Sequence, residues 1–126
     1  MRILVADDDR VLSQMLCSVL RQSGHKPFPA FDAVQSLMLA KREPLPDLVL
    51  LDIGMPGGSG LNTLTALKNS SKTFEIPVIV ISGSLDKDMP DKVAKAGAAR
   101  FLEKPVDPSM LLQVIREVMD EVGGVA

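Results

Sequence analysis

The sequence predicts an α/β fold in which five helices flank a doubly wound, five-stranded parallel sheet. Short apolar runs rich in branched residues, typical of strands buried on both faces of a parallel sheet, alternate with segments of helical periodicity. The length of 126 residues suits a single domain. With 46% hydrophobic residues and only nine glycines and nine prolines, the composition indicates a globular chain.

Five segments are interpreted as strands. Four are continuous apolar runs, at Ile3–Ala6, Leu48–Leu51, Val78–Ile81 and Ala99–Leu102. The fifth, Lys26–Phe31, contains two prolines that lack a backbone donor, so it is expected at an edge of the sheet. Right-handed crossovers restrict these strands to a few possible orders.

Five helices are predicted between and after the strands. In the first, apolar residues recur at helical spacing from Val11 to Leu20, and Ser23 with Gly24 supplies a stop. The side chains of Met15 and Cys17 are expected on the side of this helix that faces the core. The other four helices are predicted at Ala33–Arg42, Leu61–Asn69, Asp86–Ala96 and Ser109–Val122. The domain is expected to span residues 1–122, with 123–126 as a tail.

Charge and cysteine content exclude several classes of protein. The net charge of −2 is too balanced for a protein that binds nucleic acid or anionic membranes by bulk electrostatics. A single cysteine cannot form an internal disulfide and has no catalytic motif around it. The N-terminal apolar run is too short for a signal peptide or a membrane span. A cytoplasmic domain is therefore expected.

Acidic residues follow two of the predicted strands. Asp7, Asp8 and Asp9 come directly after the first strand, and Asp52 follows Leu48–Leu51. The triplet alone is equally consistent with a solvated turn in which Asp9 caps the next helix. Acids from two strands, however, would repel one another unless a cation lay between them, and carboxylate oxygens suit Mg²⁺. The sequence therefore suggests a divalent metal site at the carboxyl edge of the sheet.

Two further polar residues follow the remaining strands. Ser82 ends the strand at Val78–Ile81, and Lys104 follows the last strand. Each has an ordinary explanation as a strand terminator or a solvated lysine. Together with the acids, they can hold a phosphoryl group: Asp52 as the nucleophile, a metal ion to offset charge, and an ammonium and a hydroxyl to contact phosphoryl oxygens.

Four motifs carry a resemblance to a known family. They are ADDD at 6–9, LDIGMPGGSG at 51–60, VISG at 80–83 and EKP at 103–105. In order and spacing they resemble the CheY-like receiver domain of two-component response regulators, across essentially the whole chain. The resemblance implies a flavodoxin-like sheet with strand order 2-1-3-4-5 and a cis peptide bond between Lys104 and Pro105. It also implies a signalling domain that catalyses its own phosphorylation and dephosphorylation rather than a conventional enzyme.

The resemblance also implies a role for each site residue. Asp52 would be the phosphoacceptor, aided by Ser82 and Lys104. The metal ion, Mg²⁺ or Mn²⁺, would be held by Asp7, Asp8 and Asp52 and by the backbone carbonyl of Gly54. Ser82 and Phe101 would form the conformational switch.

The resemblance implies partners as well. A histidine kinase or histidine phosphotransfer protein would donate the phosphoryl group. A downstream protein or a fused output domain would bind the surface formed by the fourth helix, fifth strand and fifth helix, and a homodimer is possible there. No direct binding of nucleic acid or membrane is expected.

Three other classes stay open on the residues alone. In a phosphohydrolase with an aspartate nucleophile, a second acid is expected two residues after the nucleophile, where this chain has Gly54. In a nucleotide- or flavin-binding domain, a glycine-rich loop is expected where this chain has three acids. The third is a receiver-like binding module that is never phosphorylated, which the intact acids, serine and lysine argue against.

Overall fold

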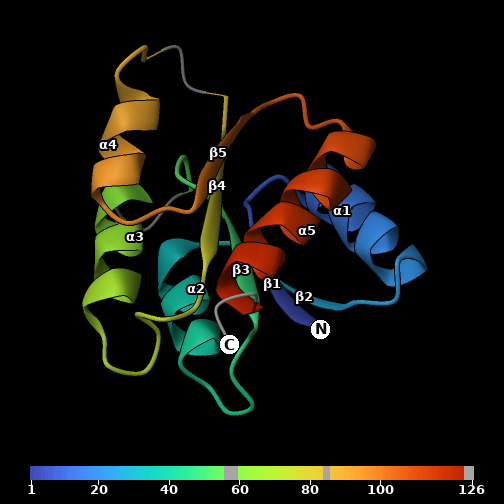
Figure 1. Cartoon of the computed structure of the whole chain (residues 1–126), viewed down its shortest axis with the longest axis horizontal. Helices are drawn as coiled ribbons and strands as arrows, with labels where there is room; N and C mark the ends of the chain where they lie inside the picture. Colours follow the sequence, from blue (N-terminus) through green and yellow to red (C-terminus); the bar gives the residue numbers. More distant parts are fainter. Residues whose placement is uncertain (56–59, 84–85, 124–126) are drawn as a thin grey trace.

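The computed structural model describes residues 1–55, 60–83 and 86–123 (Figure 1). The strands are β1 (Arg2–Ala6), β2 (Lys26–Ala30), β3 (Leu48–Asp52), β4 (Val78–Ser82) and β5 (Arg100–Glu103). They form one parallel sheet in the order β2-β1-β3-β4-β5, which confirms the predicted fold class and strand order. Each strand begins and ends within one residue of its predicted bounds.

The helices cover both faces of the sheet. They are α1 (Arg10–Gln22), α2 (Ala33–Ala40), α3 (Gly60–Asn69), α4 (Met89–Lys95) and α5 (Pro108–Gly123). Figure 1 shows α1 and α5 on one face and α2, α3 and α4 on the other. Alternate residues of β1 divide between two cores: Ile3 and Val5 pack toward α1 and α5, while Leu4 and Ala6 pack toward the other helices. Burial on both faces explains why the central strands are continuous apolar runs.

The helix bounds differ from the prediction at two places. The helix predicted from Asp86 begins only at Met89, because the Asp86 carboxylate accepts the backbone N–H of Asp88 at 2.9 Å and shapes a turn there. The helix predicted to end at Arg42 ends at Ala40, and prolines at positions 44 and 46 disfavour its continuation. Of the predicted tail, Gly123 is the last residue of α5, and 124–126 lie outside the described residues.

The proline-containing strand lies at the edge of the sheet, as predicted. The N–H of Lys26 donates to Met1 at 2.8 Å, and the carbonyl of Ala30 accepts from Asp7 at 3.0 Å. Strand alternation then directs the nitrogens of Pro27 and Pro29 away from β1, where no ladder bond is lost. The outer edge of β2 therefore presents no backbone donor at either proline. In the part of the chain that the structure describes, no helix is long and apolar enough to cross a membrane.

Candidate functional site

The sheet topology brings the acids of two strands together. Asp7 follows β1 directly, Asp52 ends β3, and the pairing of Ala6 with Leu51 sets the two strand ends side by side. One carboxylate oxygen each from Asp7, Asp8 and Asp52 lies within 4.8 Å of the others. Asp7 and Asp52 are buried, whereas Asp8 is exposed. The predicted acidic cluster therefore exists, and it opens to solvent on the side of Asp8.

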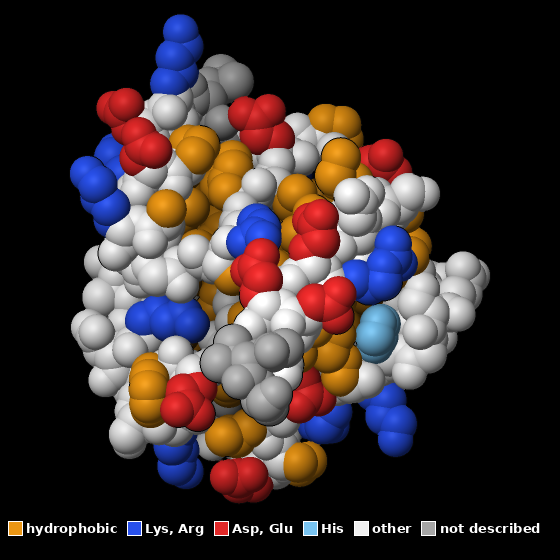
Figure 2. Space-filling model, in the orientation of Figure 1, with side chains coloured by type: hydrophobic (Ala, Val, Ile, Leu, Met, Phe, Trp, Pro, Cys, Tyr) orange, Lys and Arg blue, Asp and Glu red, His pale blue; other side chains and the backbone are white. Residues whose placement is uncertain are grey.

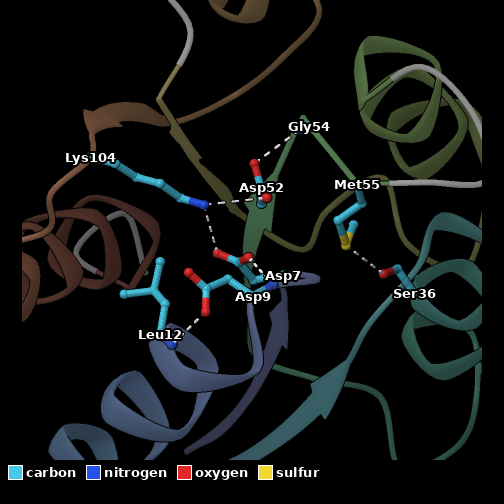
Figure 3. Close-up of polar contacts among 8 residues, drawn as sticks. All are labelled: Asp7, Asp9, Leu12, Ser36, Asp52, Gly54, Met55 and Lys104. Atoms are coloured by element: carbon cyan, nitrogen blue, oxygen red, sulfur yellow. Dashed lines mark hydrogen bonds and ion pairs between the residues drawn. The ribbon is translucent and has the colours of Figure 1, made fainter.

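The third acid of the triplet does not join the cluster. The Oδ1 atom of Asp9 accepts the backbone N–H of Leu12 at 3.0 Å and so caps α1 (Figure 3). The N–H of Asp9 in turn donates to Oδ1 of Asp7 at 2.9 Å, which fixes the Asp7 side chain. Both interpretations of the triplet thus hold in part: Asp9 is a helix cap, and the two acids before it face the cluster.

Lys104 inserts its ammonium between two of the carboxylates. Its Nζ atom lies 3.1 Å from Oδ2 of Asp7 and 3.4 Å from Oδ2 of Asp52 (Figure 3). Burial alone would lower the pKa of Lys104, but the negative charges of Asp52 and Asp7 outweigh the effect of burial, so the pKa is raised. The lysine is therefore held as a cation. The peptide bond between Lys104 and Pro105 is cis, as the resemblance implied.

The backbone after β3 also contacts the cluster. The N–H of Gly54 donates to Oδ1 of Asp52 at 2.9 Å. Further along, the buried Met55 places its sulfur 3.9 Å from the hydroxyl of Ser36 on α2 (Figure 3), which connects the start of this loop to the neighbouring helix. The loop residues 56–59 of the LDIGMPGGSG motif lie outside the described residues.

A hollow of about 400 Å³ opens beside Asp52. Ser82 reaches its wall from the end of β4, where its side chain is buried. The hollow is lined by Asp52, Ile53, Gly54, Ser82, Gly83, Met89 and Lys104. It is thus bordered by a carboxylate, a hydroxyl and an ammonium, which is the set of groups expected around a phosphoryl group.

The donor set suits a hard divalent cation. Oδ2 of Asp7 is buried and accepts no hydrogen bond from the described residues, and its described charge partner is the Lys104 ammonium. A buried carboxylate oxygen without a hydrogen bond is costly unless a cation satisfies it. Two further carboxylates lie close by, and the exposed Asp8 leaves room for the water ligands that Mg²⁺ keeps. The residues present therefore fit Mg²⁺ or Mn²⁺.

Phe101, predicted as a switch residue, lies on β5. It pairs with Val80 in the sheet and packs, partly buried, in the core beneath α2, α3 and α4. It therefore lies beside β4, the strand that carries Ser82, and shares a core with residues of α4.

Comparison with known proteins identifies the family. The profile of the response regulator receiver domain matches residues 3–116. The chain belongs to the response regulator receiver domain family. The receiver domain is 36% identical to the phosphate regulon transcriptional regulatory protein PhoB of Escherichia coli, over 99% of this chain and 54% of that protein. It is 37% identical to protein PilH of Pseudomonas aeruginosa, over 94% of this chain and 97% of that protein.

Solved structures agree with this assignment. The receiver domain superimposes on a CheY-like receiver domain protein from Methanospirillum hungatei with a TM-score of 0.92 and 27% identity, covering 99% and 98% of the two chains. The receiver domain of NtrX from Brucella abortus gives a TM-score of 0.85 at 32% identity, covering 94% and 98%. The chain spans about half the length of its PhoB relatives and nearly all of PilH. Membership of this family decides against the phosphohydrolase and the nucleotide-binding alternatives.

One feature near the site was not predicted. Met15, expected in the core, is 38% exposed, whereas Cys17 is buried as expected. Met15 borders a hollow of about 460 Å³ between α1 and the segment after β5, lined by Asp9, Leu12, Met15, Lys104, Pro105 and Val106. The helical spacing of apolar residues predicted that Met15 lies on the buried side of α1. How much of that side is covered depends on the position of α5 relative to α1, which the spacing does not give. We call this hollow the α1 groove.

Proposed function

We propose that this receiver domain accepts a phosphoryl group on Asp52 from a phosphohistidine of a histidine kinase or phosphotransfer protein. The supporting observation is the cluster of three carboxylates within 4.8 Å, with the Lys104 ammonium in contact with two of them. Asp7, Asp8 and Asp52, with the backbone carbonyl of Gly54, would hold Mg²⁺ or Mn²⁺. When bound, this cation offsets negative charge on the phosphoryl oxygens.

The transfer step is a displacement at phosphorus. A carboxylate oxygen of Asp52 forms the new O–P bond while the P–N bond to the imidazole breaks, and the electron pair stays on the imidazole nitrogen. Hydrolysis later breaks the acyl phosphate, releases inorganic phosphate and restores the carboxylate. The domain is thus a phosphoacceptor that catalyses its own modification rather than an enzyme with a separate substrate.

Two side chains around the hollow serve this step. Lys104, already a cation beside Asp52, can pair with a phosphoryl oxygen as charge accumulates there. Ser82 borders the same hollow and can donate its hydroxyl proton in a hydrogen bond to another phosphoryl oxygen. Ser82 ends β4, the neighbour of β3, and Lys104 already contacts Asp52, so little reorganisation is needed.

The α1 groove is a suitable docking site for the phosphodonor. Its walls include Leu12, Met15 and Pro105, and it shares Lys104 with the hollow beside Asp52. Val11, one turn before Met15, is 78% exposed. An apolar helix of a kinase or phosphotransfer protein lying in this groove would carry its histidine toward the acids.

The output surface would be the face of α4, β5 and α5. Phosphorylation adds about 1.5 to 2 negative charges next to Ser82, and movement of Ser82 would let Phe101 repack beneath α4. Figure 2 shows basic and acidic side chains interspersed on this face. Arg100 of β5 and Glu121 of α5 form an ion pair there. This mixed charge suits a downstream protein, a fused output domain or a second copy, and not direct contact with nucleic acid or a membrane. A cytoplasmic location follows from this role.

Intact-protein mass spectrometry after incubation with acetyl phosphate tests the proposal. We expect one phosphoryl group on the wild type with Mg²⁺, and none without Mg²⁺ or in an Asp52→Asn variant. Asp91→Asn, which changes an exposed acid on α4, is the matched control and should be phosphorylated normally.

Phosphorylation that persists in Asp52→Asn would overturn the assignment of the acceptor. If a folded, Mg²⁺-binding wild type takes up neither a phosphoryl group nor its stable mimic beryllofluoride, the domain is instead an interaction module that works without phosphorylation.

A further inference from the structure

The outer surface of α2 is apolar and carries no charge. All eight residues of the helix, Ala33–Ala40, are uncharged. Val34 and Met38 lie one turn apart on the same side and are 60% and 65% exposed. A hollow of about 340 Å³ adjoins them, lined by Met38, Leu39 and Arg42. We call Val34, Met38 and this hollow the α2 patch.

Charges of opposite sign flank the patch at the two ends of the helix. Asp32 is the N-cap, where its Oδ1 accepts the N–H of Gln35 at 2.7 Å. Lys41 and Arg42 follow the last helical residue and are exposed. The patch therefore has an acidic end and a basic end.

We infer that the α2 patch binds the α2 patch of a second copy of this chain, with the two helices antiparallel about a two-fold axis. Pairing Val34 of each copy with Met38 of the other places Asp32 opposite position 40, one residue, or about 1.5 Å along the helix, from Lys41. Each acidic end thus meets a basic end. The two helix dipoles point in opposite directions, which is the favourable arrangement for neighbouring helices. The surface is complementary to itself, which is what a two-fold interface requires.

The neighbouring edge of the sheet supports association through side chains rather than strand pairing. α2 packs on β1 and β2, and β2 is the edge strand. Because Pro27 and Pro29 remove the outward donors of β2, another strand cannot form a regular ladder there. A partner that approaches this side of the molecule therefore binds through helix side chains, and the α2 patch is an apolar surface available there.

The interface is small, so the dimer is weak. Eight residues of helix extend only about 12 Å, below the size of a standard stable interface. α2 lies at the β2 end of the sheet and α4 at the β5 end (Figure 1), so a dimer through α2 leaves the proposed output surface free. Such an interface is strengthened when two copies are already held together elsewhere, because the second contact then forms at high effective concentration.

Sedimentation equilibrium between roughly 20 µM and roughly 1 mM tests this dimer. The weight-average mass of the wild type should rise from 13.5 kDa toward twice that value. A variant with Val34→Gln and Met38→Gln should stay at the monomer mass, since glutamine favours a helix at least as well as valine and methionine but removes the apolar contact. Val11→Gln with Met110→Gln, which changes two other exposed apolar residues, on α1 and α5, should associate like the wild type.

Charge reversal supplies an independent test. Lys41→Glu with Arg42→Glu should weaken association at least several-fold, and added salt should weaken the wild type but not this variant. Urea unfolding followed by circular dichroism checks that each variant is folded. A wild type that remains monomeric throughout the range, or that associates equally well without Val34 and Met38, would overturn the inference. Normal phosphorylation of the glutamine variant by acetyl phosphate keeps this result separate from the proposed function.

Discussion

Replacing Lys104 with methionine should destabilise the protein strongly without Mg²⁺ and much less with it. The substitution keeps the aliphatic length but removes the only described cation that lies between the carboxylates of Asp7 and Asp52. Asp7 is then left with a buried oxygen that has neither a hydrogen bond nor a counter-charge among the described residues. A divalent cation bound to the same carboxylates would replace part of the lost positive charge.

The distances give the size of the effect. At an effective dielectric constant of about 20, charges 3.1 Å and 3.4 Å apart attract by roughly 5 kcal/mol each, before desolvation is subtracted. Removing one partner of a buried ion pair costs about 3–5 kcal/mol of unfolding free energy. Since the Lys104 side chain is 24% exposed, we expect the lower end, about 3 kcal/mol. In urea this corresponds to a midpoint lower by roughly 1–3 M.

Urea unfolding followed by far-ultraviolet circular dichroism measures this change, because the chain has no tryptophan or tyrosine for fluorescence. Lys92→Met is the control: its partner Asp86 is 2.9 Å away but both side chains are well exposed, so the midpoint should hardly move. Saturating Mg²⁺ should raise the midpoint of Lys104→Met more than that of the wild type. Equal midpoints for Lys104→Met and the wild type in a metal chelator would refute the reasoning.

The pKa of Lys104 sets the pH range of the effect. Because the fold raises this pKa, the ion pair stabilises the protein fully below the unfolded value of about 10.4, and the stabilisation is lost as pH rises through the folded value. The difference between the wild type and Lys104→Met should therefore be constant from about pH 6 to about pH 9 and shrink at higher pH.

Three further substitutions or measurements test the packing. Leu111→Ala, which empties a fully buried site under α5, should lower the free energy of unfolding by about 2–5 kcal/mol in a urea titration. Gly97→Ala should cost more stability than Gly24→Ala: both glycines have positive φ, but only at 97 would the new Cβ meet another atom, Cγ of Lys68 at 3.0 Å. Equal losses would show that the lysine simply moves aside. Burial raises the pKa of the Cys17 thiol, so a thiol reagent at neutral pH should modify it only in denaturant, and rapid reaction of the folded protein would contradict the buried position.

The convergence of the site residues could be predicted from the sequence because parallel strands bring their carboxyl ends to one edge. Asp7, Asp52 and Ser82 each follow or end a buried apolar run, so the strand assignment alone placed them together. Lys104 comes directly after β5, which is only partly buried, and so reaches the same edge of the sheet. This rule predicts that the side chains lie near one another, but not which atoms are in contact. Lys104 reaches Asp7 as well as Asp52 because of the path of the segment after β5, and the hydrophobic periodicity of the sequence does not specify that path.

The sequence did not predict which part of each helix surface is covered by neighbouring elements. The stripe that contains Met15 is apolar, yet α5 covers only part of it and leaves the α1 groove. Six of the eight residues of α2 are apolar and they lie around the helix, so the pattern did not indicate which of them would face solvent. The start of α4 was misplaced for another reason, since Asp86 bonds to a local backbone N–H and competes with the helix.

If Asp52 accepts a phosphoryl group and the α1 groove binds the donor, as we propose, Lys104 lies where the two events can influence each other. Its ammonium contacts Asp7 and Asp52, and its side chain borders both the hollow beside Asp52 and the α1 groove. When Asp52 carries a phosphoryl group, the negative charge at that position increases, and the ammonium is drawn further toward it. Any such movement changes the wall of the groove in which we place the phosphodonor. Under the proposed function, this side chain shared by the two cavities would give a direct physical route by which the phosphorylated domain binds its donor less tightly than the unphosphorylated one.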